Sequence, residues 1–174
     1  MNERLTIQEI AGFCPEEAVW KMLADVSNFL SKEDAGYQLG ADTIVVVGDQ
    51  FMVTGEKTHA TKEEMVWALG ATAYFAATGH VVFGGHGFSY QQEHPHVALP
   101  MLPKMFQSLT SVIHRCLCYN PSDRMSMEQL RLSAEKGLAA CSQRHRLKAK
   151  PVAEPTTEKQ YCQVEKWPEE MIAV

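Results

Sequence analysis

Four histidines in one short stretch are the side chains that could most directly do chemistry. They lie in a segment rich in glycine and proline, at His80, His86, His94 and His96. Imidazole is a common zinc ligand, but a zinc site needs three or four converging donors, each oriented by a further hydrogen bond. Only a proline separates His94 from His96, and the chain has no His-x-x-x-His pair that a helix could present. The sequence therefore favours polar residues on a long surface connection, and a metal-binding hydrolase built on residues 80–96 is the alternative.

Two other patterns lack the neighbours that catalysis would require. Gly84-Gly85-His86-Gly87 contains the glycines of a phosphate-binding loop, but it follows an apolar stretch of helical character and no lysine comes directly after it. His114 lies in an amphipathic segment, and no serine or cysteine nucleophile motif accompanies it. We therefore expect no catalytic residue, no bound metal and no cofactor.

The number and spacing of the cysteines indicate in which cellular compartment the protein resides. The chain has five cysteines, an odd number, and only Cys116 and Cys118 are close together. Their Cys-x-Cys spacing differs from the Cys-x-x-Cys pairs of zinc sites, and no second pair follows. The first ten residues contain no apolar signal-peptide core. These features predict reduced thiols, packed as small apolar residues, in a cytoplasmic protein.

Charge and composition restrict the class of partner. The 174 residues carry a formal net charge of −5, and 45% of them are hydrophobic. An acidic chain of this kind offers no general surface for nucleic acid, and no run approaches the roughly 20 apolar residues of a membrane helix. The length suffices for one domain with a real core. We expect the partner to be another protein or a peptide segment of one, not nucleic acid or a membrane.

The elements that must position these residues are mainly helices. Residues 5–11 predict a short helix, and apolar residues with helical spacing predict a second one from Pro15 to about Ser31. The members of that apolar face are Val19, Met22, Leu23, Val26 and Leu30. Residues 44–47 and 51–53, joined by a Gly-Asp turn, predict a small β-hairpin. We expect this hairpin to be the only strand pair.

The stretch 65–79 contains no charged residue and predicts a helix buried on every side. Thr61-Lys62-Glu63-Glu64 before it has the form of a capping box, and Gly79 after it is a typical helix end.

The second half of the chain predicts two more helices and a tail. Residues 80–103 form a long irregular connection with room for one short helix, and residues 109–117 predict an amphipathic helix. After a turn, a last helix begins at a capping box at 126–129 and is expected to end near Ala140. From residue 141 a short basic patch and several prolines predict a linker and tail, 141–174, outside the domain 1–140.

The order and the motifs of these elements resemble the C-terminal lobe of the protein kinase fold. Trp67-Ala68-Leu69-Gly70 is similar to the W-S-L-G that opens the central helix of that lobe, and the stretch that ends at Gly79 continues the motif. Residues 120–126, with Pro121 and Arg124, are similar to a later motif. The resemblance covers roughly residues 5–140. It implies a mainly α, kinase C-lobe-like helical domain with one small β-hairpin and no N-lobe.

The same resemblance implies that the catalytic groups of the family are missing. Gln38 stands where the family has its catalytic aspartate, and Thr43 stands where it has a metal-holding asparagine. Thr54 falls in place of the D-F-G motif, and Met65 replaces the aspartate at the head of the central helix. Phosphoryl transfer needs metal-holding carboxylates, a cationic phosphate clamp and a placed base. The chain is therefore similar to a pseudokinase.

The resemblance also implies an interaction or regulatory scaffold function. A non-catalytic kinase C-lobe is known as the KIND domain, which binds peptides of partner proteins, and residues 5–30 are similar to its opening; independent loss of an N-lobe is the alternative. We expect docking on the surface near 36–60, or through the tail, where Trp167 and Val174 are candidate partner-binding residues. The rival function is a degenerate Ser/Thr kinase homologue that retains ligand or nucleotide binding.

Arg124 poses a separate question. In the kinase family the matching arginine pairs with a glutamate of the A-P-E motif, which this chain lacks. Its substitutes here would be Glu56, Glu63 or Glu64, and the alternative is an arginine exposed to solvent.

Overall fold

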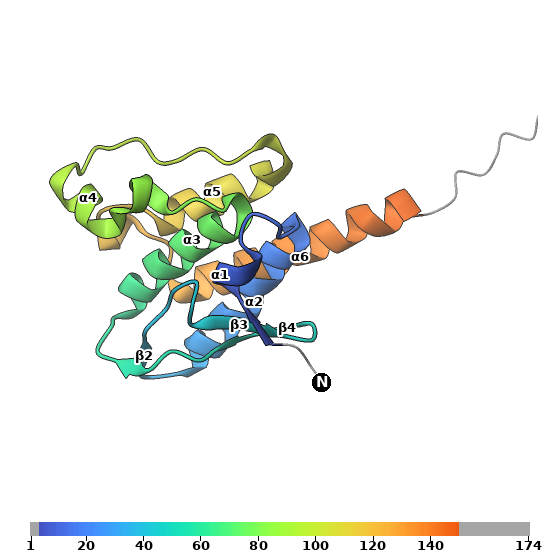
Figure 1. Ribbon diagram of the computed structural model, residues 1–174, viewed down its shortest axis with the longest axis horizontal. Helices are drawn as coiled ribbons and strands as arrows, with labels where there is room; N and C mark the ends of the chain where they lie inside the picture. Colours follow the sequence, from blue (N-terminus) through green and yellow to red (C-terminus); the bar gives the residue numbers. More distant parts are fainter. Residues whose placement is uncertain (1–3, 150–174) are drawn as a thin grey trace, which may run out of the picture.

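A central helix, packed on both sides by other helices, organises the chain. The structure is a computed structural model and describes residues 4–149 (Figure 1). Its helices are α1 (Ile7–Ile10), α2 (Glu16–Lys32), α3 (Lys62–Thr78), α4 (Gly87–Glu93), α5 (Gln107–Cys116) and α6 (Met127–Ala149), with the short 3-10 turns η1 (Val82–Gly85), η2 (Lys104–Phe106) and η3 (Pro121–Asp123). Its strands are β1 (Arg4–Thr6), β2 (Gly36–Tyr37), β3 (Ile44–Val47), β4 (Gln50–Val53) and β5 (Lys57–Thr58). The fold is mainly helical with a small sheet, as the sequence predicts.

The central helix is α3, in the predicted place. The Thr61 hydroxyl accepts from the Glu64 N–H at 3.2 Å, and the Glu64 carboxylate accepts from the Thr61 N–H at 2.7 Å, which completes the capping box. Gly79 ends the helix in the left-handed region, with φ of 73°. A side chain at Gly70 would lie 2.5 Å from Cβ of Cys116, so this glycine allows α5 to pack closely against α3. The face that contains Met65, Leu69 and Ala73 is buried between neighbouring helices, but Trp67 and Phe75 are only half-buried, so the prediction of burial on every side is wrong.

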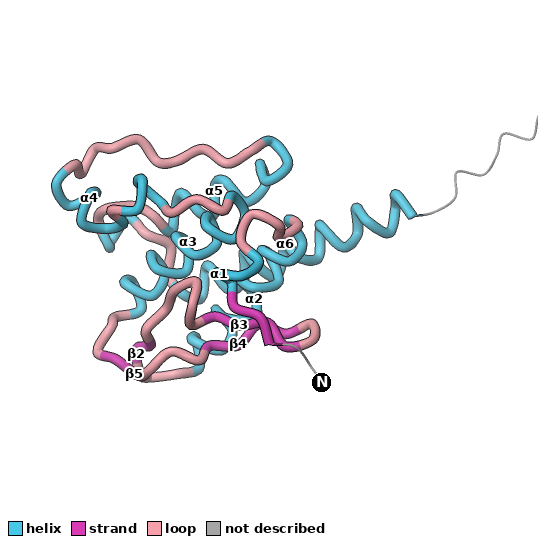
Figure 2. The backbone as a smooth tube through the Cα atoms, viewed as in Figure 1, coloured by secondary structure: helices cyan, strands magenta, loops and turns pink. Residues whose placement is uncertain are grey.

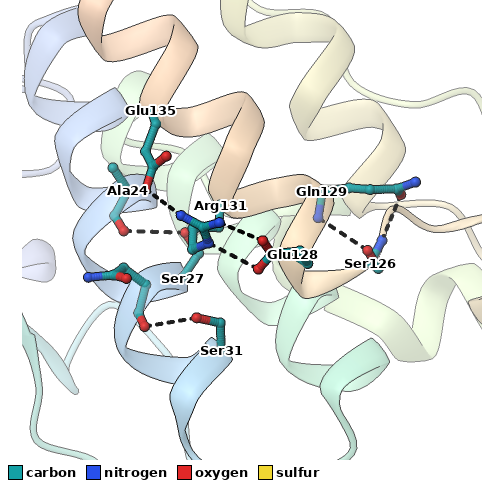
Figure 3. A network of polar contacts seen from close by, with 9 residues as sticks. Ala24, Ser27, Ser31, Ser126, Glu128, Gln129, Arg131 and Glu135 are labelled. Atoms are coloured by element: carbon teal, nitrogen blue, oxygen red, sulfur yellow. Dashed lines mark hydrogen bonds and ion pairs between the residues drawn. The ribbon is translucent and has the colours of Figure 1, made fainter.

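Helices α2 and α6 form the most extensive helix pair of the body. All five members of the predicted apolar face of α2 are buried. Gly137 of α6 lies against the Trp20 ring, since a Cβ atom there would lie 2.5–2.6 Å from three ring atoms. Ser27 is fully buried on α2, and its hydroxyl donates to the Leu23 carbonyl of the same helix. It also lies 3.3 Å from the Ala24 carbonyl oxygen, the contact drawn in Figure 3.

The last helix is longer than the sequence predicts. It begins as expected, because Ser126 and Gln129 exchange hydrogen bonds between side chain and backbone (Figure 3). The expected end near Ala140 is wrong, since α6 continues to Ala149. Ion pairs of Arg144 with Glu16 (3.1 Å) and of His145 with Glu17 (2.8 Å) hold its last turns on the start of α2. The basic residues after position 141 suggested a linker, but Arg144 among them pairs with an acidic residue in the first turn of α2.

The strands gather at one end of the molecule (Figure 2). The predicted hairpin is present as β3 and β4, with Gly48 in the turn at φ of 65°. The expectation of a single strand pair is wrong. β1 adds to β3 and makes a three-stranded antiparallel sheet of order β1-β3-β4, and β2 pairs with β5 in a second ladder of two strands. The short helix predicted at 5–11 is α1, reduced to residues 7–10 because β1 takes up residues 4–6.

Side-chain hydrogen bonds join the sheet to the helical body. The Asp25 carboxylate of α2 accepts from the Phe51 N–H of β4 at 3.0 Å and also binds Lys21 at 3.1 Å. Two strands alone make no stable sheet, so this attachment to a helix is what the hairpin requires.

The connection after α3 contains the one short helix for which the sequence left room, α4, together with the 3-10 turn η1. Its longest stretch without helix or strand is residues 94–103. No helix in the described range 4–149 has both the length and the apolar character needed to cross a membrane.

Candidate functional site

The four positions singled out by the kinase resemblance lie together in the structure. They are contributed by the loop before β3, the end of β4 and the head of α3. The Gln38 N–H donates to the Glu56 carbonyl at 2.9 Å, and the Thr54 N–H donates to the Thr43 carbonyl at 2.8 Å. Gly55 makes this approach feasible, because a side chain there would collide with the Gln38 carbonyl oxygen. The loop at 38–43 is therefore bound directly to the segment 54–56.

The hydroxyl groups in this cluster are occupied by the backbone. Thr43 Oγ1 accepts from the Gly40 N–H at 2.9 Å and donates to the Gln38 carbonyl at 3.0 Å. Thr54 Oγ1 donates to the Thr43 carbonyl at 3.0 Å. These threonines close a turn, and neither is aimed at an open site as a nucleophile or a metal ligand would be.

Met65 occupies the head of the central helix and is 1% exposed. Its sulfur accepts a hydrogen bond from the Tyr37 N–H at 3.3 Å, which ties α3 to the strand that precedes the loop at 38–43. A thioether is a weak acceptor, but it carries no charge that burial would penalise. The residue therefore fills the space and partners the backbone N–H at the same time.

The carboxylates that a divalent cation would require do not converge in this region. Asp42 lies in the loop but is exposed, and Glu56 contributes its carbonyl to the contact with Gln38. Across residues 4–149, no group of three or more His, Cys, Asp or Glu side chains is arranged to hold a metal ion.

The histidines of the 80–96 segment point to different surroundings. His86 and His94 both stack with the Tyr90 ring, with ring centroids 6.2 and 4.3 Å away. His80 lines a hollow beside the turn before α2, whereas His96 lines another beside Tyr119. The structure therefore does not bring the four imidazoles to one centre.

The cysteines of the described residues are free thiols. Cys116 is fully buried where α5 meets α3, and burial raises the pKa of its thiol to about 12. A thiol with so high a pKa stays neutral and is a poor nucleophile. Cys118 is half-buried and donates to the His114 carbonyl at 3.5 Å.

Two motif residues of the resemblance, Trp67 and Arg124, lie at one corner of the body, where they line the same hollow. The Trp67 indole N–H donates to the Gln91 side chain at 2.9 Å, and Gln91 donates to the Leu117 carbonyl at 2.6 Å. Pro121 opens η3, where the Asn120 side chain accepts from the Ser122 N–H. Gln91 is buried, and no feature of the sequence around it signals this bridging role.

Arg124 is the cation of that corner, and neither expectation for it is correct. Its side chain is 8% exposed, so it is not a solvent-facing arginine. It makes no ion pair with a carboxylate of the described residues. Instead, the guanidinium donates to three backbone carbonyls, of Cys118 (2.6 Å), Glu63 (3.1 Å) and Tyr119 (2.8 Å). Burial lowers its pKa from the usual value, although nearby acidic groups, including Glu64 and Glu63, oppose the shift.

Arg124 also faces an aromatic cluster. The guanidinium carbon lies 5.4 Å from the centroid of the Phe88 ring, within the range of a cation–π contact. Trp67 meets the same ring edge-on at 5.4 Å, and Tyr119 stacks on it at 5.9 Å. A hollow of about 180 Å³ opens between Arg124, Trp67, Phe88 and Glu64.

Two hollows with apolar linings lie beside α3. One, of about 370 Å³, runs along the outer face of α3 next to the loop at 38–43, and its apolar lining includes Leu39, Ala41, Trp67, Ala71 and Phe75. The second, of about 540 Å³, lies at the other end of α3 and is lined by Phe13 and Met101. The sequence offered no signal for the second, because neither residue belongs to a periodic apolar pattern.

The predicted partner-binding residues Trp167 and Val174 lie outside the described residues. Comparison of this chain with protein-family models and with curated proteins finds no match.

Proposed function

We propose that this chain is a catalytically inactive, kinase C-lobe-like module that binds another protein or a peptide segment of one. It acts as a scaffold or regulatory unit in the cytoplasm, a compartment in which its cysteines remain thiols. The observation that carries the proposal is the environment of Met65. At the positions where the kinase family keeps a base, metal ligands and a bracing aspartate, this chain has Gln38, Thr43, Thr54 and Met65, and these residues hydrogen-bond to backbone groups or pack in the core.

A binding role is supported by the surface beside this cluster. The hollow along α3 combines the loop at 38–43, which falls in the predicted docking region, with apolar side chains such as Leu39 and Phe75. An apolar groove rimmed by polar residues is typical of peptide recognition. Leu39 and Ala41 are half-buried and form the loop side of the groove.

The rival nucleotide-binding and metal-hydrolase functions are tested by ligand-induced stabilisation. A ligand that binds only the native state stabilises it by RT ln(1 + [L]/Kd) and so raises the melting temperature, by an amount that grows with the logarithm of the ligand concentration above Kd. We expect no shift with ATP and Mg²⁺ or with Zn²⁺, and no transfer of ³²P from ATP to a general protein substrate. A shift of several degrees with either ligand would contradict the proposal.

The binding role is tested by affinity capture with the full chain. A Leu39→Asp, Ala41→Asp variant places charge in the groove, and removal of residues 150–174 deletes the tail. Leu132→Asp is the matched control, because Leu132 is an exposed apolar residue of α6, outside residues 36–60 and outside the lining of the groove. We expect a reproducible partner to be retained by the control and lost when groove and tail are both altered. Retention by the doubly altered chain would refute both docking surfaces.

A further inference from the structure

The hollow lined by Phe13 and Met101 exposes the most accessible apolar side chains of the described residues. Phe13 is 89% exposed and Met101 is 74% exposed. The hollow is the largest of those described here, about 540 Å³, and its lining includes Phe13, Cys14, Tyr74, His80, Met101 and Phe106. Single exposed apolar residues are ordinary, but two such residues that face one hollow indicate an interaction site.

Phe13 is held outward by an ordered backbone. The Phe13 N–H donates to the Ile10 carbonyl at 3.1 Å, and the Gly12 N–H donates to the Ala76 carbonyl of α3 at 3.0 Å. Gly12 adopts a φ of 79° and packs directly on Gly79, an arrangement that other residues rarely reach. The exposed ring is therefore a fixed feature of the turn, not a frayed end.

Residues 142–145 of α6 lie beside the start of α2, next to the turn that borders this hollow. Ser142 and His145 bind Glu17, and Arg144 binds Glu16, directly after the turn that carries Phe13. From His145 to Ala149 the helix advances only about 6 Å at 1.5 Å per residue. Residues 150–174 follow, which is 174 − 149 = 25 residues. Fully extended, the 17 residues from 150 to 166 span about 56–61 Å, more than enough to return residue 167 to the hollow.

We propose that the segment 167–174, Trp-Pro-Glu-Glu-Met-Ile-Ala-Val, binds in the Phe13–Met101 hollow of its own chain. Trp167, Met171 and Ile172 supply apolar side chains for the hollow. Glu169 and Glu170 supply negative charge.

One cationic side chain borders the hollow. The exposed Lys104 lies between two lining residues, Pro103 and Phe106, and could pair with the carboxylates of the segment, while the His80 imidazole is part of the lining. Because the segment is tethered, its effective concentration is of millimolar order, so even a weak intrinsic affinity fills the hollow.

This inference goes beyond the proposed function and does not depend on it. When bound, the segment covers an apolar surface that a partner's side chains would otherwise contact. The chain then carries its own competitor for that surface, and partner binding there requires displacement of residues 167–174.

The test uses the full chain labelled with 5-fluorotryptophan and observed by ¹⁹F NMR. The chain has three tryptophans, so three lines are expected, and a Trp167→Phe variant assigns the line of the tail. The perturbing variant is Phe13→Ser, Met101→Ser, and Met52→Ser is the control at an exposed apolar residue elsewhere. The lines of Trp20 and Trp67 report that each variant remains folded.

We expect the Trp167 line of the wild-type chain to differ from that of a free peptide of residues 160–174. It moves to the free-peptide position in the Phe13→Ser, Met101→Ser variant and stays unchanged in Met52→Ser, at every protein concentration. The proposal is overturned if the Trp167 line of the wild-type chain already has the chemical shift of the free peptide, or if the double substitution leaves that chemical shift unchanged. A line position that depends on concentration, with a dimer mass by light scattering, assigns the segment to a second copy and overturns binding within the chain.

Discussion

Met65 is a buried residue whose uncharged sulfur accepts a backbone hydrogen bond. Met65→Leu conserves volume but removes the sulfur that accepts from Tyr37 N–H. Since an unpaired buried donor costs roughly 1 kcal/mol or more, we expect the free energy of unfolding to fall by about 1 kcal/mol more than in Met22→Leu. Met22 is a fully buried control with no such hydrogen bond. Urea unfolding measures the difference, and equal losses in the two variants would show that the sulfur contributes only packing.

Arg124 depends on the shape of its side chain as well as on its charge. The guanidinium reaches three carbonyls on two segments, which a single ammonium group cannot span. We expect Arg124→Lys to lower the free energy of unfolding by about 1–3 kcal/mol through unpaired carbonyls and a poorly partnered cation. Arg115→Lys, at an exposed residue of α5, is the control and should stay within about 0.5 kcal/mol of wild type. A tolerated Arg124→Lys would contradict the role assigned to the guanidinium geometry.

At the scale of elements, Gly137 determines how closely α6 approaches α2. Alanine is the better helix former by about 1 kcal/mol, so Gly137→Ala would stabilise an isolated helix. In the folded chain the added methyl group would lie 2.5 Å from the Trp20 ring. We therefore expect a net loss of about 1–3 kcal/mol from overpacking, visible as a lower melting temperature. Lys136→Ala, at the exposed neighbour, should have little effect, and a stabilised Gly137→Ala would show that the two helices can move apart freely.

The helices with strong local signals could be predicted from the sequence. The capping boxes at Thr61 and Ser126, the αL glycine at 79 and the periodic face of α2 are encoded within a few residues of each helix, and the structure has all of them. The strands β1, β2 and β5 have only two or three residues and are defined by partners far along the chain. No local period can indicate such strands, so the sequence revealed only the hairpin.

The end of α6 and the contacts of Arg124 could not be predicted for the same reason, because they depend on partners far along the chain. Residues 141–149 resemble a linker by composition, but Glu16 and Glu17, more than 120 residues away, pair with their cations. The Gln91 bridge likewise joins residues that are 24 and 26 positions apart. Interactions of this range depend on the packed fold, so the sequence offered Arg124 only a carboxylate partner or exposure to solvent, and not the three backbone carbonyls that it binds.

At the scale of the whole molecule, Glu16 joins three helices and makes stability depend on pH. Burial would raise its pKa, but hydrogen bonds from Ser108, Trp20 and Arg144, with the charge of Arg144, lower it overall. Hydrogen bonds from Ser142 and His145 lower the pKa of Glu17. A carboxyl group with a lowered folded-state pKa stabilises the fold above its unfolded value, about 4.3, and this contribution is lost as pH falls through the folded value.

We therefore expect the free energy of unfolding to decrease between about pH 5 and pH 3, more steeply in the wild type than in Glu16→Gln, Glu17→Gln. The variant should be less stable at pH 7 and should approach the wild type in acid. Glu9 and Glu128 also have lowered pKa values, but both chains retain them, so their contribution cancels in the comparison. Urea unfolding at several pH values measures the difference, and parallel curves would mean that the contacts between α2 and α6 do not depend on ionisation.

The pairing of α2 with α6 also determines the order in which the chain can fold during synthesis. The contact between Ser142 and Glu17 joins residues 125 positions apart. At about 5–20 residues per second, a ribosome needs roughly 6–25 s to add the residues between them. Throughout that interval the apolar face of α2 has no access to its main helical partner. The nascent N-terminal half is thus exposed to aggregation until the last helix emerges, and a chaperone that shields α2 during translation should raise the yield of folded protein.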